Sequence, residues 1–106
     1  MICDTSHALR ELFTHAKGTL STEKLEWLGG LDDHAEIEAD NIAATLQTLG
    51  GLMASDDKTA QPSDYDLAQM LWGLAAQASN VAALIHISGE AEYLANEQKA
   101  SQGGDQ

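Results

Sequence analysis

The residues best placed to do chemistry are histidines that have a glutamate four positions later: His34 with Glu38, and His86 with Glu90. On a helix this spacing puts both side chains on one face, where they could share a metal ion. If two antiparallel helices turn near Lys58, the two pairs lie at similar heights. However, all four residues fall outside the apolar positions of their helices, whereas metal sites in bundles use ligands that point inward. We therefore expect solvated helix-face residues, with no metal and no cofactor.

Groups for nucleophilic or acid–base catalysis lack the surroundings that they need. The single cysteine, Cys3, lies near a terminus without a predicted base nearby, and it cannot form an internal disulfide. Ser21, Ser55 and Ser63 fit helix caps and loops. Adjacent carboxylates have no buried environment that would separate their pKa values. The sequence predicts a protein that is not an enzyme.

The elements that position these residues are helices, because the apolar residues recur with a helical period. One seam steps by three and four residues, and only its aspartate is not apolar: Leu25, Leu28, Asp32, Ala35, Ala39, Ile42, Leu46, Leu49 and Met53. The phase continues through Gly29-Gly30, so we predict one long helix over roughly residues 22–53, weakened or kinked at the glycines. The alternative is a break, with a new helix starting at Asp32 or Asp33.

Two further helices flank this one. A short helix over 4–17, capped by Asp4, Thr5 or Ser6, ends at Gly18 in a left-handed conformation. Its apolar face is Leu9, Leu12, Phe13 and Ala16. After a loop over 54–62, Ser63 caps a third helix that is apolar nearly all round, and we expect it to be buried. Its seam is Leu67, Leu71, Leu74, Ala78, Val81, Ile85 and Ser88.

The expected fold class is all-α, because no stretch alternates with the period of a strand. We predict an antiparallel helical hairpin of two long helices plus the short N-terminal helix, forming a single domain over 1–100 with a disordered tail over 101–106. Aromatic residues are only 5% of the chain, so the core is built from leucine, isoleucine and alanine and is shallow for a monomer. We therefore expect the chain to form a homodimer whose helices pack as a four-helix-type bundle.

The charge of the chain constrains its partners. Seventeen acidic and five basic side chains give a net charge of −12. Such a surface repels phosphate backbones, which disfavours direct contact with nucleic acid or an anionic membrane. The sequence shows no signal peptide and no apolar run of membrane length, so we expect a cytoplasmic protein with a protein partner.

A line of carboxylates beside the first seam is the sharpest surface feature. Glu26, Asp33 and Asp40 recur every seven residues, and Glu36 widens the line. We call these four residues the acidic face. They could stand in for phosphates and meet a basic nucleic-acid-binding groove; the plainer alternative is a solvated helix face.

The aromatic and large apolar residues beside the seams suggest contacts. We expect Trp27 to pack against the first helix, and Trp72 to contact a second subunit or a partner. The predicted dimer or partner contact consists of Met70, Trp72, Leu84 and Ile87.

The segments 20–52 and 64–93 resemble small helical proteins carried by proteobacterial prophages and integrative elements. The resemblance lies in the words LEWL (25–28), EADNIA (38–43) and AEY (91–93). It implies a mobile-element origin and no functional residues. The leading interpretation is therefore a non-enzymatic protein-binding or regulatory module. The alternative is an inhibitor of host defence, such as an anti-CRISPR or a nucleic-acid mimic.

Overall fold

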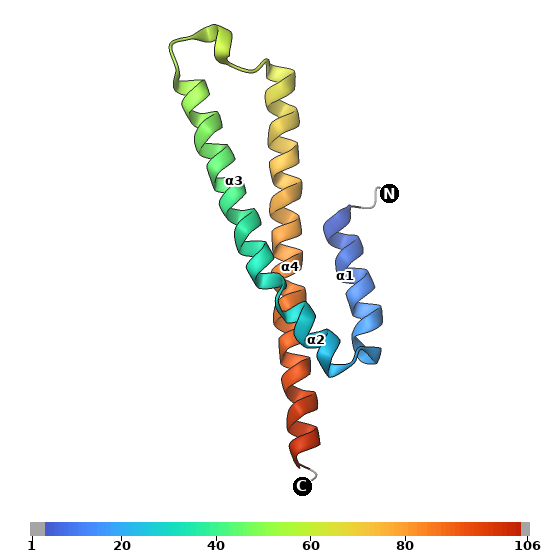
Figure 1. The fold of residues 1–106 in the computed structure, drawn as a ribbon. Helices are drawn as coiled ribbons and strands as arrows, with labels where there is room; N and C mark the ends of the chain where they lie inside the picture. The colour runs from blue at the N-terminus through green and yellow to red at the C-terminus, as the bar shows by residue number, and fades with distance from the viewer. Residues whose placement is uncertain (1–3, 105–106) are drawn as a thin grey trace.

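A computed structural model describes residues 4–104 of the chain, and within that range every regular element is a helix. The predicted all-α fold class is confirmed. In chain order, the α-helices and the two short 3-10 turns are α1 (Thr5–Ala16), η1 (Lys17–Thr19), α2 (Thr22–Gly29), α3 (Leu31–Ala54), η2 (Lys58–Ala60) and α4 (Asp64–Gly104) (Figure 1). Cys3 lies outside the described residues.

Three helices begin where a side chain accepts a hydrogen bond from a free N–H group of the first turn. Asp4 Oδ1 accepts from the His7 N–H at 2.7 Å, and Ser21 Oγ accepts from the Lys24 N–H at 3.2 Å. Ser63 Oγ accepts from the Asp66 N–H at 3.1 Å. These caps start α1, α2 and α4, as the sequence predicts.

Two predicted helix ends are wrong. Gly18 does not adopt a left-handed conformation; α1 instead tightens into η1, where the Thr19 hydroxyl donates to the Ala16 carbonyl. Residues 101–104 belong to α4 rather than to a separate tail. Ser101 and Gln102 carry no signal that stops a helix, and α4 continues through Gly104, the last described residue.

The prediction of one continuous helix over 22–53 is also wrong. Gly30 (φ −77°, ψ −3°) separates α2 from α3, and the new helix starts at Leu31 rather than at either aspartate. The Ser88 hydroxyl donates to the Gly29 carbonyl oxygen at 2.6 Å, so the break lies on the surface of α4. The bend lets α2 cross α4 while α3 runs beside it (Figure 1).

The core lies where α1, α2 and α4 meet. Its buried members are Phe13, Leu25, Ile87, Ala91 and Ala95. The side chains at this part of the interface are small: two alanines on α4 face Gly29, and a Cβ on Gly29 would make an ordinary van der Waals contact with the Glu92 Cβ at 3.7 Å. Small residues thus allow α2 to cross α4 closely.

The predicted seams are only partly covered. In the first seam, Leu25, Ala35 and Leu49 are buried, whereas Ala39 is exposed and Leu46 is 46% exposed. In α4, Leu74 and Ser88 are buried, whereas the seam residues Ala78 and Ile85 are exposed. The expectation that α4 is buried nearly all round is wrong. The reason is that α1, α2 and α3 together cover only part of the circumference of α4 within residues 4–104.

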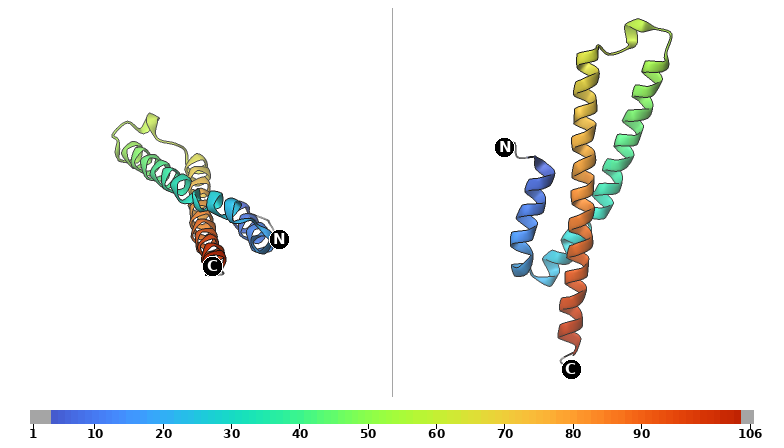
Figure 2. Two further views of the ribbon diagram at one scale, coloured as in Figure 1. Left: turned by 60° about the horizontal axis from the view of Figure 1, so that its bottom comes forward. Right: turned by 180° about the vertical axis from the view of Figure 1, so that it is seen from behind.

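The molecule is elongated and flat. It measures 70 × 30 × 12 Å along its three principal axes. In Figure 1, α3 and α1 lie on opposite sides of α4 and α2 crosses in front of it. Seen from behind, α4 passes in front of α2, with α1 and α3 on either side (Figure 2).

The expectation that the chain has no apolar run of membrane length is corrected by α4. By length and composition alone, this helix is apolar enough to cross a membrane: an 18-residue window has a mean hydropathy of 1.3, and 17% of that window is buried. The core helices of soluble proteins can meet the same criterion. Most residues of this window are therefore not buried by the other helices of residues 4–104.

Candidate interaction surface

The acidic face divides between two helices. Glu26 lies on α2 and forms an ion pair with Lys99 of α4. Asp33, Glu36 and Asp40 lie on α3 and are exposed, and none of them joins an ion pair formed within residues 4–104. The break at Gly30 therefore separates Glu26, which helps to hold α2 on α4, from three carboxylates that face solvent.

The two histidine–glutamate pairs do not come together in one site. His86 Nε2 lies 3.2 Å from Glu90 Oε2, and the other oxygen of Glu90 binds Lys17 Nζ. His34 and Glu38 instead line a hollow beside α1. Within the described residues, no three histidine, cysteine or acidic side chains are arranged to hold a metal ion.

A row of polar contacts fastens the first two helices to α4. Lys17 at the end of α1 reaches Glu90, and Thr22 at the start of α2 donates to Gln98. The Gln98 amide also donates to the Leu20 carbonyl oxygen at 3.4 Å. These contacts join residues more than seventy positions apart in the sequence, and no local pattern predicts them.

The predicted contact residues end up in different places. Ile87 is 4% exposed and belongs to the core, which corrects its assignment to a dimer or partner contact. Leu84 is half-buried beside the same core, whereas Met70 and Trp72 are exposed, Trp72 by 67%. Trp27 is 77% exposed, so the expectation that it packs against the first helix is wrong. The core side of α2 is taken by Leu25, and Trp27 points away from it.

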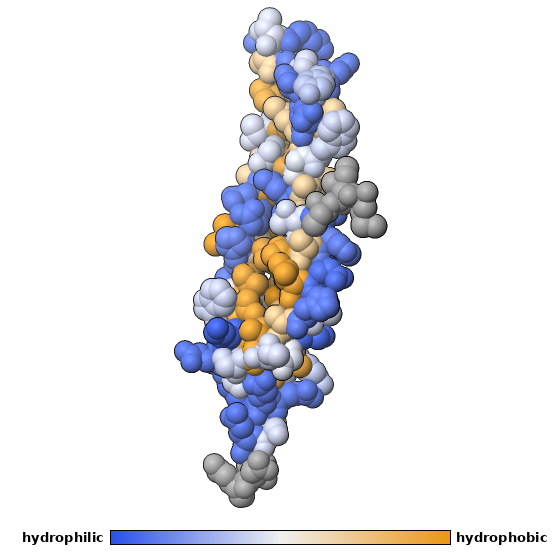
Figure 3. All heavy atoms as spheres, turned by 90° about the vertical axis from the view of Figure 1, so that its right-hand side faces the viewer, coloured by the Kyte–Doolittle hydropathy of each residue, from blue (hydrophilic) through white to orange (hydrophobic). Residues whose placement is uncertain are grey.

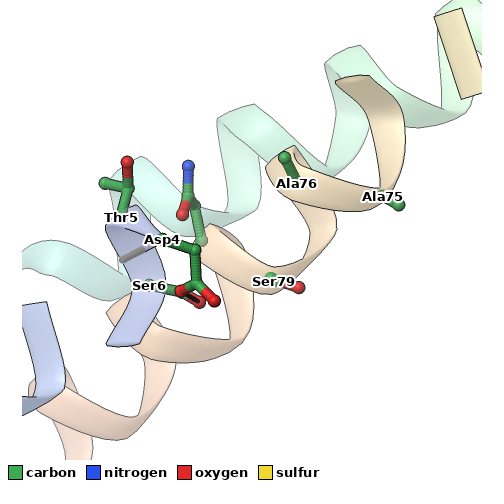
Figure 4. Close-up of a pocket in the computed structure, with 7 residues that line it drawn as sticks. Asp4, Thr5, Ser6, Ala75, Ala76 and Ser79 are labelled. Carbon is green, nitrogen blue, oxygen red and sulfur yellow. Dashed lines mark hydrogen bonds between the residues drawn. The ribbon is translucent and has the colours of Figure 1, made fainter. Parts of the chain in front are cut away.

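A hollow of about 360 Å³ lies between the first turn of α1 and α4 (Figure 4). Its polar residue at the helix start is Asp4, which accepts hydrogen bonds from the His7 N–H and the Ser6 hydroxyl. The hydrogen bond from the His7 N–H is the main cause of a lowered pKa at Asp4, and the bond from the Ser6 hydroxyl lowers it further. The wall from α4 is Ala75, Ala76, Ser79 and Asn80. This is the arrangement of a helix cap, in which the Asp4 carboxylate accepts from the first turn of α1.

A second hollow, of about 320 Å³, is lined only by apolar side chains from all four α-helices and from the link between α1 and α2. Figure 3 shows it as a depression within an apolar patch on the α1 side of the molecule. Ligand sites combine an apolar lining with a few polar groups that orient the ligand. This hollow has no such group, and no buried side-chain N or O atom in the described part of the chain lacks a hydrogen-bond partner.

The largest uncovered feature was not identified from the sequence. The face of α4 that points away from α2 carries exposed aromatic residues separated by multiples of seven positions: Tyr65, Trp72 and Tyr93. The spacing itself was a signal, but the apolar residues on the other sides of α4 masked it. The Tyr93 hydroxyl donates to Glu97 Oε1 at 2.8 Å, which raises the pKa of Tyr93.

Comparisons of the chain with models of protein families, with curated proteins and with solved structures found no match.

Proposed function

We propose that this chain is a non-enzymatic, acidic helical module that acts by binding protein, and that it works as a homodimer in the cytoplasm. A mobile-element origin accords with its resemblance to small helical proteins of prophages and integrative elements. The observation that carries the proposal is the amount of surface that the single chain leaves uncovered.

The accessible surface of the chain is 7538 Å². A compact monomer of 11.3 kDa exposes about 5,700 Å². The surplus of about 1,800 Å² exceeds the roughly 800 Å² that each partner contributes to a standard interface. The radius of gyration of 19.3 Å likewise exceeds the value of about 13 Å for a globular domain of this length. A second layer of protein would remove this surplus.

Pairing of two helical hairpins, each made of α3 and α4, would supply that layer and give a four-helix core. The exposed apolar residues along these two helices support this arrangement: Ile37, Leu46, Met53, Met70, Leu71, Trp72 and Ile85. Large exposed apolar areas on a soluble chain mark sites of protein interaction.

Sedimentation equilibrium of the full chain tests the homodimer. We expect a dimer at tens of micromolar, and a clean monomer there would remove the case for a shared core. Affinity capture from the native host, with mass spectrometry of the captured proteins, tests the binding module itself. The absence of any captured protein would contradict that role independently of the oligomeric state.

The second candidate function is a phage-type inhibitor, such as an anti-CRISPR or nucleic-acid mimic, that blocks a basic nucleic-acid-binding groove. It is favoured by Asp33, Glu36 and Asp40, three exposed carboxylates on one helix without an ion pair among residues 4–104. Evenly placed carboxylates can substitute for phosphates in a basic groove.

The test of this second function is the double substitution Asp33→Lys and Asp40→Lys. We expect it to abolish capture of a basic partner and to leave the helical circular dichroism unchanged. The matched control is Asp56→Lys and Asp64→Lys, which changes the net charge equally but lies outside the acidic face. Equal loss of capture in both variants would show that net charge, rather than this face, attracts the partner.

A further inference from the structure

Within residues 4–104, no helix lies over the face of α4 opposite α2, and the first turn of α1 borders it beside Ala75 and Ser79 (Figure 2). Along this face, residues separated by three and four positions form a stripe, which we call the outer stripe. All of its members are exposed except the half-buried Ala68: Tyr65, Ala68, Trp72, Ala75, Ser79, Ala82, His86, Gly89, Tyr93 and Asn96. This 3-4 spacing is that of the seam of a coiled coil.

Side-chain size alternates along the outer stripe. One set of positions, spaced by seven residues, carries the larger side chains together with one serine: Tyr65, Trp72, Ser79, His86 and Tyr93. The four positions that alternate with these are small: Ala68, Ala75, Ala82 and Gly89. Two such stripes fit closely only when a large residue of one faces a small residue of the other. In a parallel pair, Trp72 would face Trp72 and Ala75 would face Ala75, which crowds the large residues and leaves gaps at the small ones.

We propose that the outer stripe is the antiparallel contact between α4 helices of two copies of this chain. The inference rests on the proposed self-association and specifies its surface. In the register with full overlap, Trp72 lies opposite Gly89 of the partner subunit, and Tyr93 lies opposite Ala68 of the partner subunit. Each member of the stripe from 65 to 96 then has a counterpart. The two helix dipoles also oppose each other, which is favourable.

The occupant is a second copy because the surplus surface of about 1,800 Å² is enough for one standard interface. A lipid bilayer fits the face less well. Ser79, His86 and Asn96 interrupt the stripe with polar groups, and the neighbouring helix α3 carries the exposed carboxylates Asp33 and Glu36. Charged side chains there are costly, and the net charge of −12 opposes an anionic surface.

The substitution Gly89→Leu tests the stripe without threatening the fold. A Cβ on Gly89 meets no atom within 4 Å, and leucine favours a helix more than glycine does. The added side chain would, however, occupy the space that Trp72 of the partner subunit needs. We expect the dimer dissociation constant, measured by sedimentation equilibrium, to rise at least about tenfold.

The matched control is Gly73→Leu. Gly73 lies on the same helix and is equally open, but it is not a member of the outer stripe. We expect it to dimerise like the wild type. If Gly89→Leu also dimerises like the wild type, the outer stripe is not the interface, although self-association stands. If the wild type is a monomer at tens of micromolar, both the stripe and the homodimer are wrong.

Disulfide trapping in a Cys3→Ser background tests the direction of the helices. Ala75 lies opposite His86 of the partner subunit in the proposed register, so a mixture of Ala75→Cys and His86→Cys chains should cross-link. Neither variant should cross-link alone, because its two copies would be roughly 16 Å apart along the helix, beyond the reach of a disulfide. Cross-linking of either variant alone would contradict the antiparallel arrangement.

Binding of a monomeric wild type to phosphatidylcholine vesicles would assign the stripe to a membrane instead.

Discussion

At the scale of single residues, the role of an apolar side chain on α4 depends on which helices approach it. Ile85 and Ile87 are two positions apart, yet Ile85 is 55% exposed and Ile87 is 4% exposed. The sequence pattern placed Ile85 in a buried seam and Ile87 in an intermolecular contact. The structure instead buries Ile87 and exposes Ile85, because α1 and α2 reach α4 on the side of Ile87.

This pair gives a direct test of the core. We expect Ile87→Ala to lower the free energy of unfolding by about 2–5 kcal/mol, because it leaves a cavity in the core. Ile85→Ala should change it by less than about 0.5 kcal/mol, since the side chain is exposed within the monomer. Urea denaturation at low protein concentration measures both. Equal effects would mean that the core lies elsewhere.

The carboxyl group of Asp4, which caps α1, should make the stability of this helix start depend on pH in a predictable direction. The hydrogen bonds from the His7 N–H and the Ser6 hydroxyl hold the pKa of Asp4 below its ordinary value of 3.8. Because the folded pKa is lowered, the stabilisation is present above the unfolded pKa and is lost as the pH falls through the folded pKa. We expect an NMR titration midpoint of the Asp4 carboxyl below 3.8. In Asp4→Asn, which keeps a capping oxygen, amide exchange at His7 should lose the part of its pH dependence that comes from this carboxyl. A midpoint at or above the ordinary value would contradict the cap.

At the scale of elements, the crossing of α2 over α4 decides the path of the chain. Gly29 approaches Glu92 closely, and its carbonyl oxygen accepts from the Ser88 hydroxyl. Since Ser88 is buried, the bond forms away from water. The break at Gly30 then directs α3 along the other side of α4. A local pair of glycines thus sets the arrangement of three helices.

Removing the hydroxyl at the crossing tests this arrangement. We expect Ser88→Ala to destabilise the fold by about 1 kcal/mol, because a hydrogen bond is lost and the Gly29 carbonyl oxygen loses its partner. The control Ser101→Ala changes an exposed serine on the same helix and should cost less than about 0.5 kcal/mol. Thermal unfolding followed by circular dichroism compares the two. If Ser88→Ala is as stable as the control, the crossing does not depend on this bond.

At the scale of the whole molecule, a chain this long and flat cannot enclose a core along its entire length. Near the loop, where residues 4–104 place no third helix beside α3 and α4, the side chains of Leu46, Met70 and Trp72 are exposed. Globular domains bury such faces between at least two layers. The missing layer is the physical basis for both proposals of a protein partner.

Salt distinguishes the two kinds of partner. Two copies of a chain with a net charge of −12 repel each other, and salt screens this repulsion. When the salt concentration rises from 0.1 M to 1 M, the screening length falls from about 10 Å to about 3 Å. We expect self-association to tighten several-fold, as measured by sedimentation equilibrium. Capture of a basic partner by the acidic face should weaken over the same range. A dimer that dissociates in salt would indicate ion pairs, rather than the apolar stripe, at its interface.

The sequence by itself determined the features that depend on neighbours along the chain. Ser21 and Ser63 start helices because each hydroxyl accepts from an N–H three residues later, and the 3-4 spacing of apolar residues excludes strands. The exposure of Asp33, Glu36 and Asp40 follows from their positions off the seam. Their binding role stays a prediction, as does the contact through Met70 and Trp72.

Only the tertiary structure decided which faces are covered. The break at Gly30, the burial of Ile87 and the exposure of Trp27 all depend on where α1 and α2 lie on α4. Contacts such as Lys17 with Glu90 join distant segments, so no local period encodes them. An alanine-rich helix that is apolar nearly all round offers several equivalent faces, and the packing of the other helices selects among them.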